Sequence, residues 1–87
     1  MIIKAETFSG SKRYHCGSIS GALDKAINES AEMELIIMAV FNKFGEEVDW
    51  KHVRVRLDKV KNYSKFNIFT RIDRATGFMT VKKAIRG

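Results

Sequence analysis

The sequence contains no proline, and only six of its 87 residues are glycine. It has no stretch that resembles a flexible linker, no internal repeat and no low-complexity tract. A chain of this length can bury one hydrophobic core, and its 45% content of hydrophobic residues argues against disorder. We therefore expect residues 1–87 to form a single small domain.

Cysteine and long apolar segments are also scarce. The one cysteine, Cys16, cannot form an internal disulfide, and the first residues lack the charged and apolar regions of a signal peptide. The only unbroken apolar run covers residues 35–41, whereas a membrane-spanning helix needs about 20 apolar residues. These absences predict a cytoplasmic protein that does not bind a membrane.

Side chains for catalysis are few. His15 and His52 are the only histidines, and neither has a partner at the spacing of metal ligands. The acidic pair Glu46 and Glu47 lies in a predicted turn, and adjacent side chains on a strand would point to opposite faces. We expect no enzymatic activity, no catalytic residue, no metal, no cofactor and no small-molecule substrate.

Acidic residues are rare in the second half of the chain. Residues 1–47 carry five basic and seven acidic side chains, whereas residues 48–87 carry eleven basic and three acidic ones. The total net charge is +6, and the C-terminal half alone has a net charge of +8. Such an asymmetry favours a polyanionic partner, either nucleic acid or an acidic protein surface.

The apolar run at residues 35–41 is rich in β-branched residues and predicts a central strand with both faces buried. Residues 2–8 and 13–16 predict an N-terminal hairpin around the turn at residues 9–12. Ser18 or Ser20 can cap a helix that ends near residues 28–30. Its apolar stripe, which predicts packing on a sheet, consists of Ala22, Leu23, Ala26 and Ile27.

The C-terminal half predicts further strands. Residues 52–57 alternate strictly, with Val53, Val55 and Leu57 on one face and His52, Arg54 and Arg56 on the other. Residues 66–72 and 78–85 predict a hairpin around the turn at residues 73–77. The predicted fold is therefore α+β, with an N-terminal β-hairpin, one helix packed on a mainly antiparallel sheet, and a basic C-terminal β-meander.

An alternative fold is a winged helix-turn-helix. Asp49 could cap a helix over residues 51–61, whose apolar residues Trp50, Val53, Leu57 and Val60 have helical spacing. This alternative also requires residues 33–44 to be helical. The objection is that such a helix would be apolar all round, which is unsuitable for the outside of a small domain.

The basic residues are interleaved with aromatic ones, a combination that suits phosphates and stacked bases. The candidate rings are Trp50, Tyr63, Phe66 and Phe69. The predicted binding residues are Lys51, His52, Arg54, Arg56, Lys59, Lys61, Tyr63, Lys65, Arg71, Arg74, Lys82 and Lys83. The leading expectation is a small non-enzymatic module that binds RNA or single-stranded DNA. The alternative is an inhibitor or adaptor, of the kind phages and mobile elements encode, that binds a larger protein through its basic face.

Overall fold

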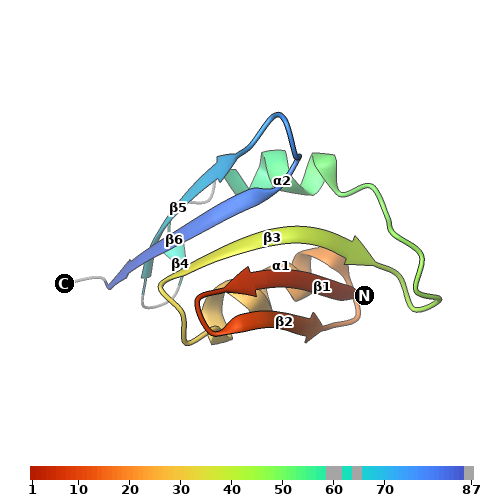
Figure 1. Ribbon diagram of the computed structural model, residues 1–87, viewed down its shortest axis with the longest axis horizontal. Helices are drawn as coiled ribbons and strands as arrows, with labels where there is room; N and C mark the ends of the chain where they lie inside the picture. Colours follow the sequence, from red (N-terminus) through yellow and green to blue (C-terminus); the bar gives the residue numbers. More distant parts are fainter. Residues whose placement is uncertain (59–61, 64–65, 86–87) are drawn as a thin grey trace.

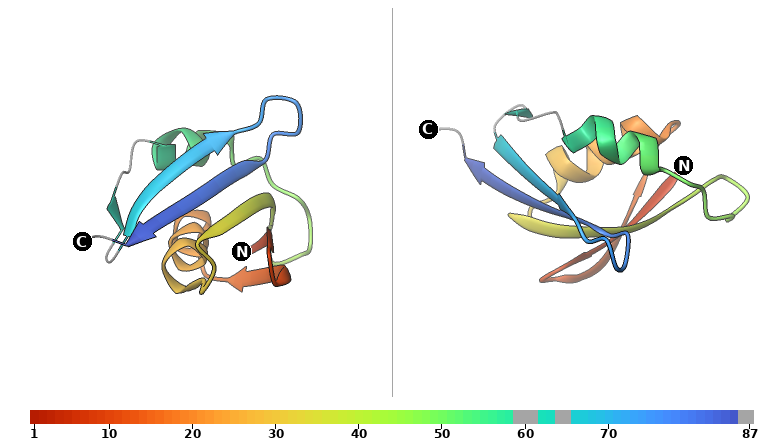
Figure 2. Two further views of the ribbon diagram at one scale, coloured as in Figure 1. Left: turned by 60° about the vertical axis from the view of Figure 1, so that its left-hand side comes forward. Right: turned by 90° about the horizontal axis from the view of Figure 1, so that it is seen from above.

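The protein forms one antiparallel sheet with both helices on the same side (Figures 1 and 2). The computed structural model describes residues 1–58, 62–63 and 66–85. The strand order is β2-β1-β3-β6-β5-β4. The strands are β1 (Ile2–Thr7), β2 (Gly10–His15), β3 (Glu34–Phe41), β4 (Asn62–Tyr63), β5 (Phe66–Ile72) and β6 (Met79–Ile85). The predicted α+β class is confirmed.

Helix α1 (Ile19–Glu29) covers the β1–β2 side of the sheet. The hydroxyl of Ser18 accepts a hydrogen bond from the Gly21 amide at 3.1 Å, so one of the two predicted caps begins the helix. The predicted stripe, Ala22, Leu23, Ala26 and Ile27, is fully buried. The helix therefore lies on the sheet through the face that its apolar spacing defines.

The core lies between the helices and the inner face of β3. The side chains of Leu35, Ile37 and Val40 are almost completely buried there. In register with them, Ala5 of β1 lies opposite Ile37, and Val81 of β6 lies opposite Leu35. The apolar run at residues 35–41 is a central strand, as its composition predicted.

The strand predicted for residues 52–57 is wrong, because this segment belongs to a second helix, α2 (Lys51–Asp58). An Asp49 carboxylate oxygen accepts from the Lys51 amide at 3.0 Å, which satisfies a first-turn donor. Trp50 and Val53, three residues apart, are both buried. The alternating residues include one apolar pair four positions apart, Val53 and Leu57, and Trp50 lies three positions before Val53. The pattern therefore fits a helix once Trp50 and Asp49 are included.

The winged helix-turn-helix alternative is also wrong. It requires a helix over residues 33–44, but β3 occupies most of this range and pairs with both β1 and β6. The helical assignment of residues 51–58 was the correct part of that alternative. The single helix of the leading prediction is corrected to two helices, and residues 52–57 are not part of a C-terminal meander.

One face of the sheet is covered by neither helix of the described residues, and we call it the open face. The expectation that both faces of residues 35–41 are buried is therefore wrong. Ile36 lies between the buried Leu35 and Ile37 and points to the open face, where 36% of its surface is exposed. Among the helices of the described residues, none is long and apolar enough to cross a membrane.

Candidate nucleic-acid interface

The open face carries an exposed aromatic ring beside cations. Phe69 lies between the buried Ile68 and the half-buried Thr70 in β5, and its side chain is 61% exposed. The strand register places Lys82 of β6 directly opposite Phe69, and Glu34 of β3 directly opposite Lys82. Directly opposed side chains on one sheet face are in contact range. Glu34, Lys82 and Phe69 thus form one row across three strands.

Two further predicted cations adjoin this row. Phe69, Lys82, Glu34 and Arg71 line a shallow depression of about 360 Å³ together with Thr70 and Thr80. A second depression, of about 590 Å³, shares Arg71 and Thr80 and extends to Arg74 in the turn after β5. Of the predicted binding residues, Arg71, Arg74 and Lys82 are therefore brought together, and all three are exposed.

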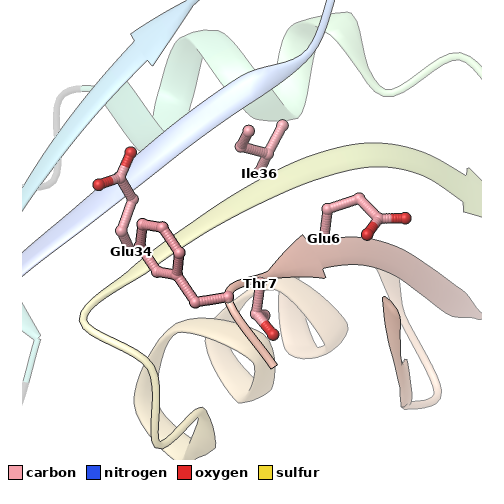
Figure 3. A pocket seen from close by; sticks show the side chains of 5 residues that line it. Glu6, Thr7, Glu34 and Ile36 are labelled. Atoms are coloured by element: carbon pink, nitrogen blue, oxygen red, sulfur yellow. The ribbon is translucent and has the colours of Figure 1, made fainter. Parts of the chain in front are cut away.

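The other end of the open face is apolar and acidic. Phe8, which is 87% exposed, and Ile36 line a depression of about 140 Å³ together with Thr7, Glu6 and Glu34. Figure 3 shows Glu6, Glu34 and Ile36 projecting from β1 and β3 on the side away from α1, whereas Thr7 points the opposite way. The Glu6 carboxylate accepts from the Ser11 hydroxyl at 2.5 Å. Glu34 lines both this depression and the one that contains Phe69.

Two more cations of the open face come from the N-terminal half, and the sequence reasoning missed them. Lys4 lies between the fully buried Ile3 and Ala5, so it points to the open face, and Arg13 of β2 lies directly opposite it. Like charges in directly opposed positions destabilise a sheet. The alternation of residues 2–8 was the signal that could have identified the face of Lys4.

The remaining described cations of the predicted set lie on the helical side of the sheet. Lys51, His52 and Arg56 are exposed on α2. His52 and Arg56 were expected to share one sheet face with Arg54, but α2 packs on the face opposite to the one that carries Phe69. The predicted set is therefore divided between two sides of the molecule.

Two predicted binding residues, Arg54 and Lys83, are held in contacts within the protein. The Arg54 guanidinium donates to the Gly77 carbonyl oxygen and lies 4.7 Å from the centre of the Trp50 ring. The Lys83 ammonium is buried and donates to the carbonyl oxygens of Ile27 at 3.0 Å and Ser30 at 2.6 Å. Because their charged groups already have partners inside the protein, we remove both from the binding set.

The candidate aromatic rings differ in their exposure to solvent. Trp50 is 5% exposed and belongs to the core, and Phe66 is half-buried with the Lys83 ammonium 4.7 Å from its ring centre. Of the predicted rings with a described side chain, only Phe69 is exposed. Tyr63 lies in β4, and its side chain is outside the described part of the structure. Lys59, Lys61 and Lys65 also lie outside the described residues.

Residues 1–58, 62–63 and 66–85 contain no group of three or more histidine, cysteine, aspartate or glutamate side chains that could hold a metal ion. In comparisons with known proteins, no family model, no curated protein and no solved structure matches this chain. The function is therefore argued from the geometry of the open face alone.

Proposed function

We propose that the protein is a non-enzymatic module that binds single-stranded nucleic acid, RNA or DNA, on its open face. The observation that carries the proposal is the exposed Phe69 ring with Lys82 directly opposite it and Arg71 two positions along the same strand face. Single strands bind where a flat ring accepts a stacked base and cations accept the adjacent phosphates.

The uncovered apolar surface supports this proposal. The chain exposes Phe69, Ile36 and Phe8 on one face, although burying large apolar side chains is favourable by about 1.5–3 kcal/mol each. The like-charged pair Lys4 and Arg13 on the same face also costs stability. A ligand that combines aromatic surface with negative charge would offset both costs.

The test compares charge reversals on the two sides of the sheet. Arg71→Glu with Lys82→Glu should abolish binding of a labelled single-stranded oligonucleotide in fluorescence anisotropy. Lys51→Glu with Arg56→Glu is the matched control, since it changes the net charge equally on exposed residues of α2. It should weaken binding only through the long-range field, by less than about tenfold.

Phe69→Ala tests the ring without changing the charge. Base–aromatic stacking is worth about 1–3 kcal/mol, so we expect the affinity to fall about 5- to 150-fold. Binding that survives the Arg71 and Lys82 reversal but is lost in the Lys51 and Arg56 control would place the interface on α2 and overturn the proposal.

We propose, as the second candidate, a protein-binding inhibitor or adaptor. It is supported by the apolar and acidic end of the open face, where Phe8 and Ile36 lie beside the carboxylates of Glu6 and Glu34. Exposed apolar side chains with a polar rim are typical of protein interfaces, and carboxylates repel phosphates.

The ratio of absorbance at 260 and 280 nm after purification at low salt separates the two candidates. Co-purifying nucleic acid favours the first, and a nucleic-acid-free protein that does not bind oligonucleotides favours the second.

A further inference from the structure

We propose that Glu34 and Lys82 read the edge of a base stacked on Phe69, and that the site prefers cytosine to thymine. This inference rests on the proposed function and deepens it, because it names the kind of nucleotide that the open face takes. It also gives a role to a carboxylate that contributes nothing favourable to phosphate binding.

The position of Glu34 carries the first step. Glu34, Lys82 and Phe69 occupy directly opposed positions on three adjacent strands. The Cα atoms of Glu34 and Phe69 are therefore about 10 Å apart, the sum of two antiparallel pair spacings. Both residues line the same depression of about 360 Å³. A base lying flat on the Phe69 ring extends across Lys82 and presents its edge to Glu34.

The chemistry of the two side chains carries the second step. An ionised carboxylate only accepts hydrogen bonds, and an ammonium group only donates them. Cytosine presents its N4 amino donor beside the N3 acceptor, which matches Glu34 beside Lys82. In the same orientation, thymine presents the O4 carbonyl in place of the amino group and a protonated N3 in place of the acceptor. Two acceptors would then meet at Glu34 and two donors at Lys82. The pair thus discriminates between two pyrimidines that stack equally well.

The test measures the affinity of the full chain for oligo(dC) and oligo(dT) of equal length at neutral pH. We expect oligo(dC) to bind about tenfold more tightly. Glu34→Gln should reduce this ratio to near one, because an amide can either donate or accept. Both oligonucleotides should bind the variant at least as tightly as before, since one negative charge is removed from the face.

Glu6→Gln is the matched control. Glu6 lines the same face and the same apolar depression as Glu34, but it lies on β1, away from Phe69. Its neutralisation should strengthen binding of both oligonucleotides and preserve their ratio. Equal affinities for the two oligonucleotides in the wild type, or a ratio that Glu34→Gln leaves unchanged, would overturn the inference and leave the proposed function standing. Failure of the wild type to bind either oligonucleotide would overturn the proposed function as well.

Discussion

Lys82 and Lys83 are neighbours in β6, and the alternation of the strand places their ammonium groups in opposite environments. Lys82 is exposed on the open face, whereas Lys83 donates to the carbonyl oxygens of Ile27 and Ser30 at the end of α1. The terminal carbonyls of a helix have no partner within the helix. Lys83 therefore caps α1 from a strand more than fifty positions away in the sequence.

Lys83→Met should reduce the free energy of unfolding by about 1–3 kcal/mol at neutral pH, since it leaves buried carbonyl oxygens without donors. Lys82→Met is the matched control, because it removes the same charge from an exposed site and should change stability by less than about 0.5 kcal/mol. Urea denaturation of both variants measures the difference. Equal effects of the two substitutions would mean that the contacts of Lys83 with α1 contribute nothing.

Lys83 also makes the stability of the protein depend on pH. Burial lowers the pKa of Lys83 below 10.5, and the negative charge of Glu32 opposes this shift in part. The folded state thus releases the proton at a lower pH than the unfolded state does, so stability contributed by this group rises as the pH increases through the folded pKa toward 10.5. A neutral amine still donates to both carbonyls. We expect the stability difference between wild type and Lys83→Met to grow with pH across this alkaline range, and a constant difference would contradict this.

Ile36 and Ile37 form another matched pair of neighbours. Ile37 is fully buried between β1 and β6, whereas Ile36 is 36% exposed on the open face. Ile37→Asp should prevent stable folding, since an unpaired buried charge costs several kcal/mol against a total stability of about 5–15 kcal/mol. Ile36→Asp should leave a folded protein, as measured by circular dichroism and thermal denaturation. A folded Ile37→Asp variant would show that the core lies elsewhere.

At the scale of elements, α2 joins the hairpin of β5 and β6 through Arg54. Its guanidinium donates to Gly77 in the turn between the two strands and stacks on Trp50 at the start of the helix. A hydrogen bond to a charged group contributes about 1.5–3 kcal/mol, so Arg54→Glu should destabilise the protein by at least this amount. Arg56→Glu, on the exposed side of the same helix, should not. Equal denaturation midpoints for the two variants would contradict this structural role.

The sequence predicted an element best where the spacing of its apolar residues favoured one kind of secondary structure over the other. Ala22, Leu23, Ala26 and Ile27 have only helical spacing. Residues 35–41 did have a helical alternative, which was disfavoured because such a helix would be apolar all round. Residues 52–57 fit both periods, and the decision depended on Asp49 and Trp50, which lie outside the six-residue window. The location of the site could not be predicted, because it depends on which face each strand turns away from the helices. This orientation of the strands places Lys82 and Lys83 on opposite faces of the sheet, and it places Arg13 and Lys4 on the open face.

At the scale of the whole molecule, the open face carries cations from both halves of the chain, although the net positive charge lies in the C-terminal half. Arg71, Arg74 and Lys82 come from the basic half, and Lys4 and Arg13 come from the acidic one. Neutralising phosphates releases condensed counterions, so the affinity for an oligonucleotide should fall with salt. With three to five phosphate contacts, the slope of log K against log salt concentration should be about −2 to −3.5 for a single strand.

Two alanine double variants measure how much the cations of β1 and β2, and those of α2, contribute to this slope. Lys4→Ala with Arg13→Ala should make the slope less negative by about 1.4, the share of two phosphate contacts. Lys51→Ala with Arg56→Ala removes the same charge from α2 and should leave the slope almost unchanged. The oligonucleotide must be long enough to cross the sheet from β5 to β2, since a shorter one would not reach Lys4 and Arg13. A slope that responds to the α2 pair and not to the β1–β2 pair would show that the polyanion follows the helical side, and the exposed Phe69 ring would then need another ligand.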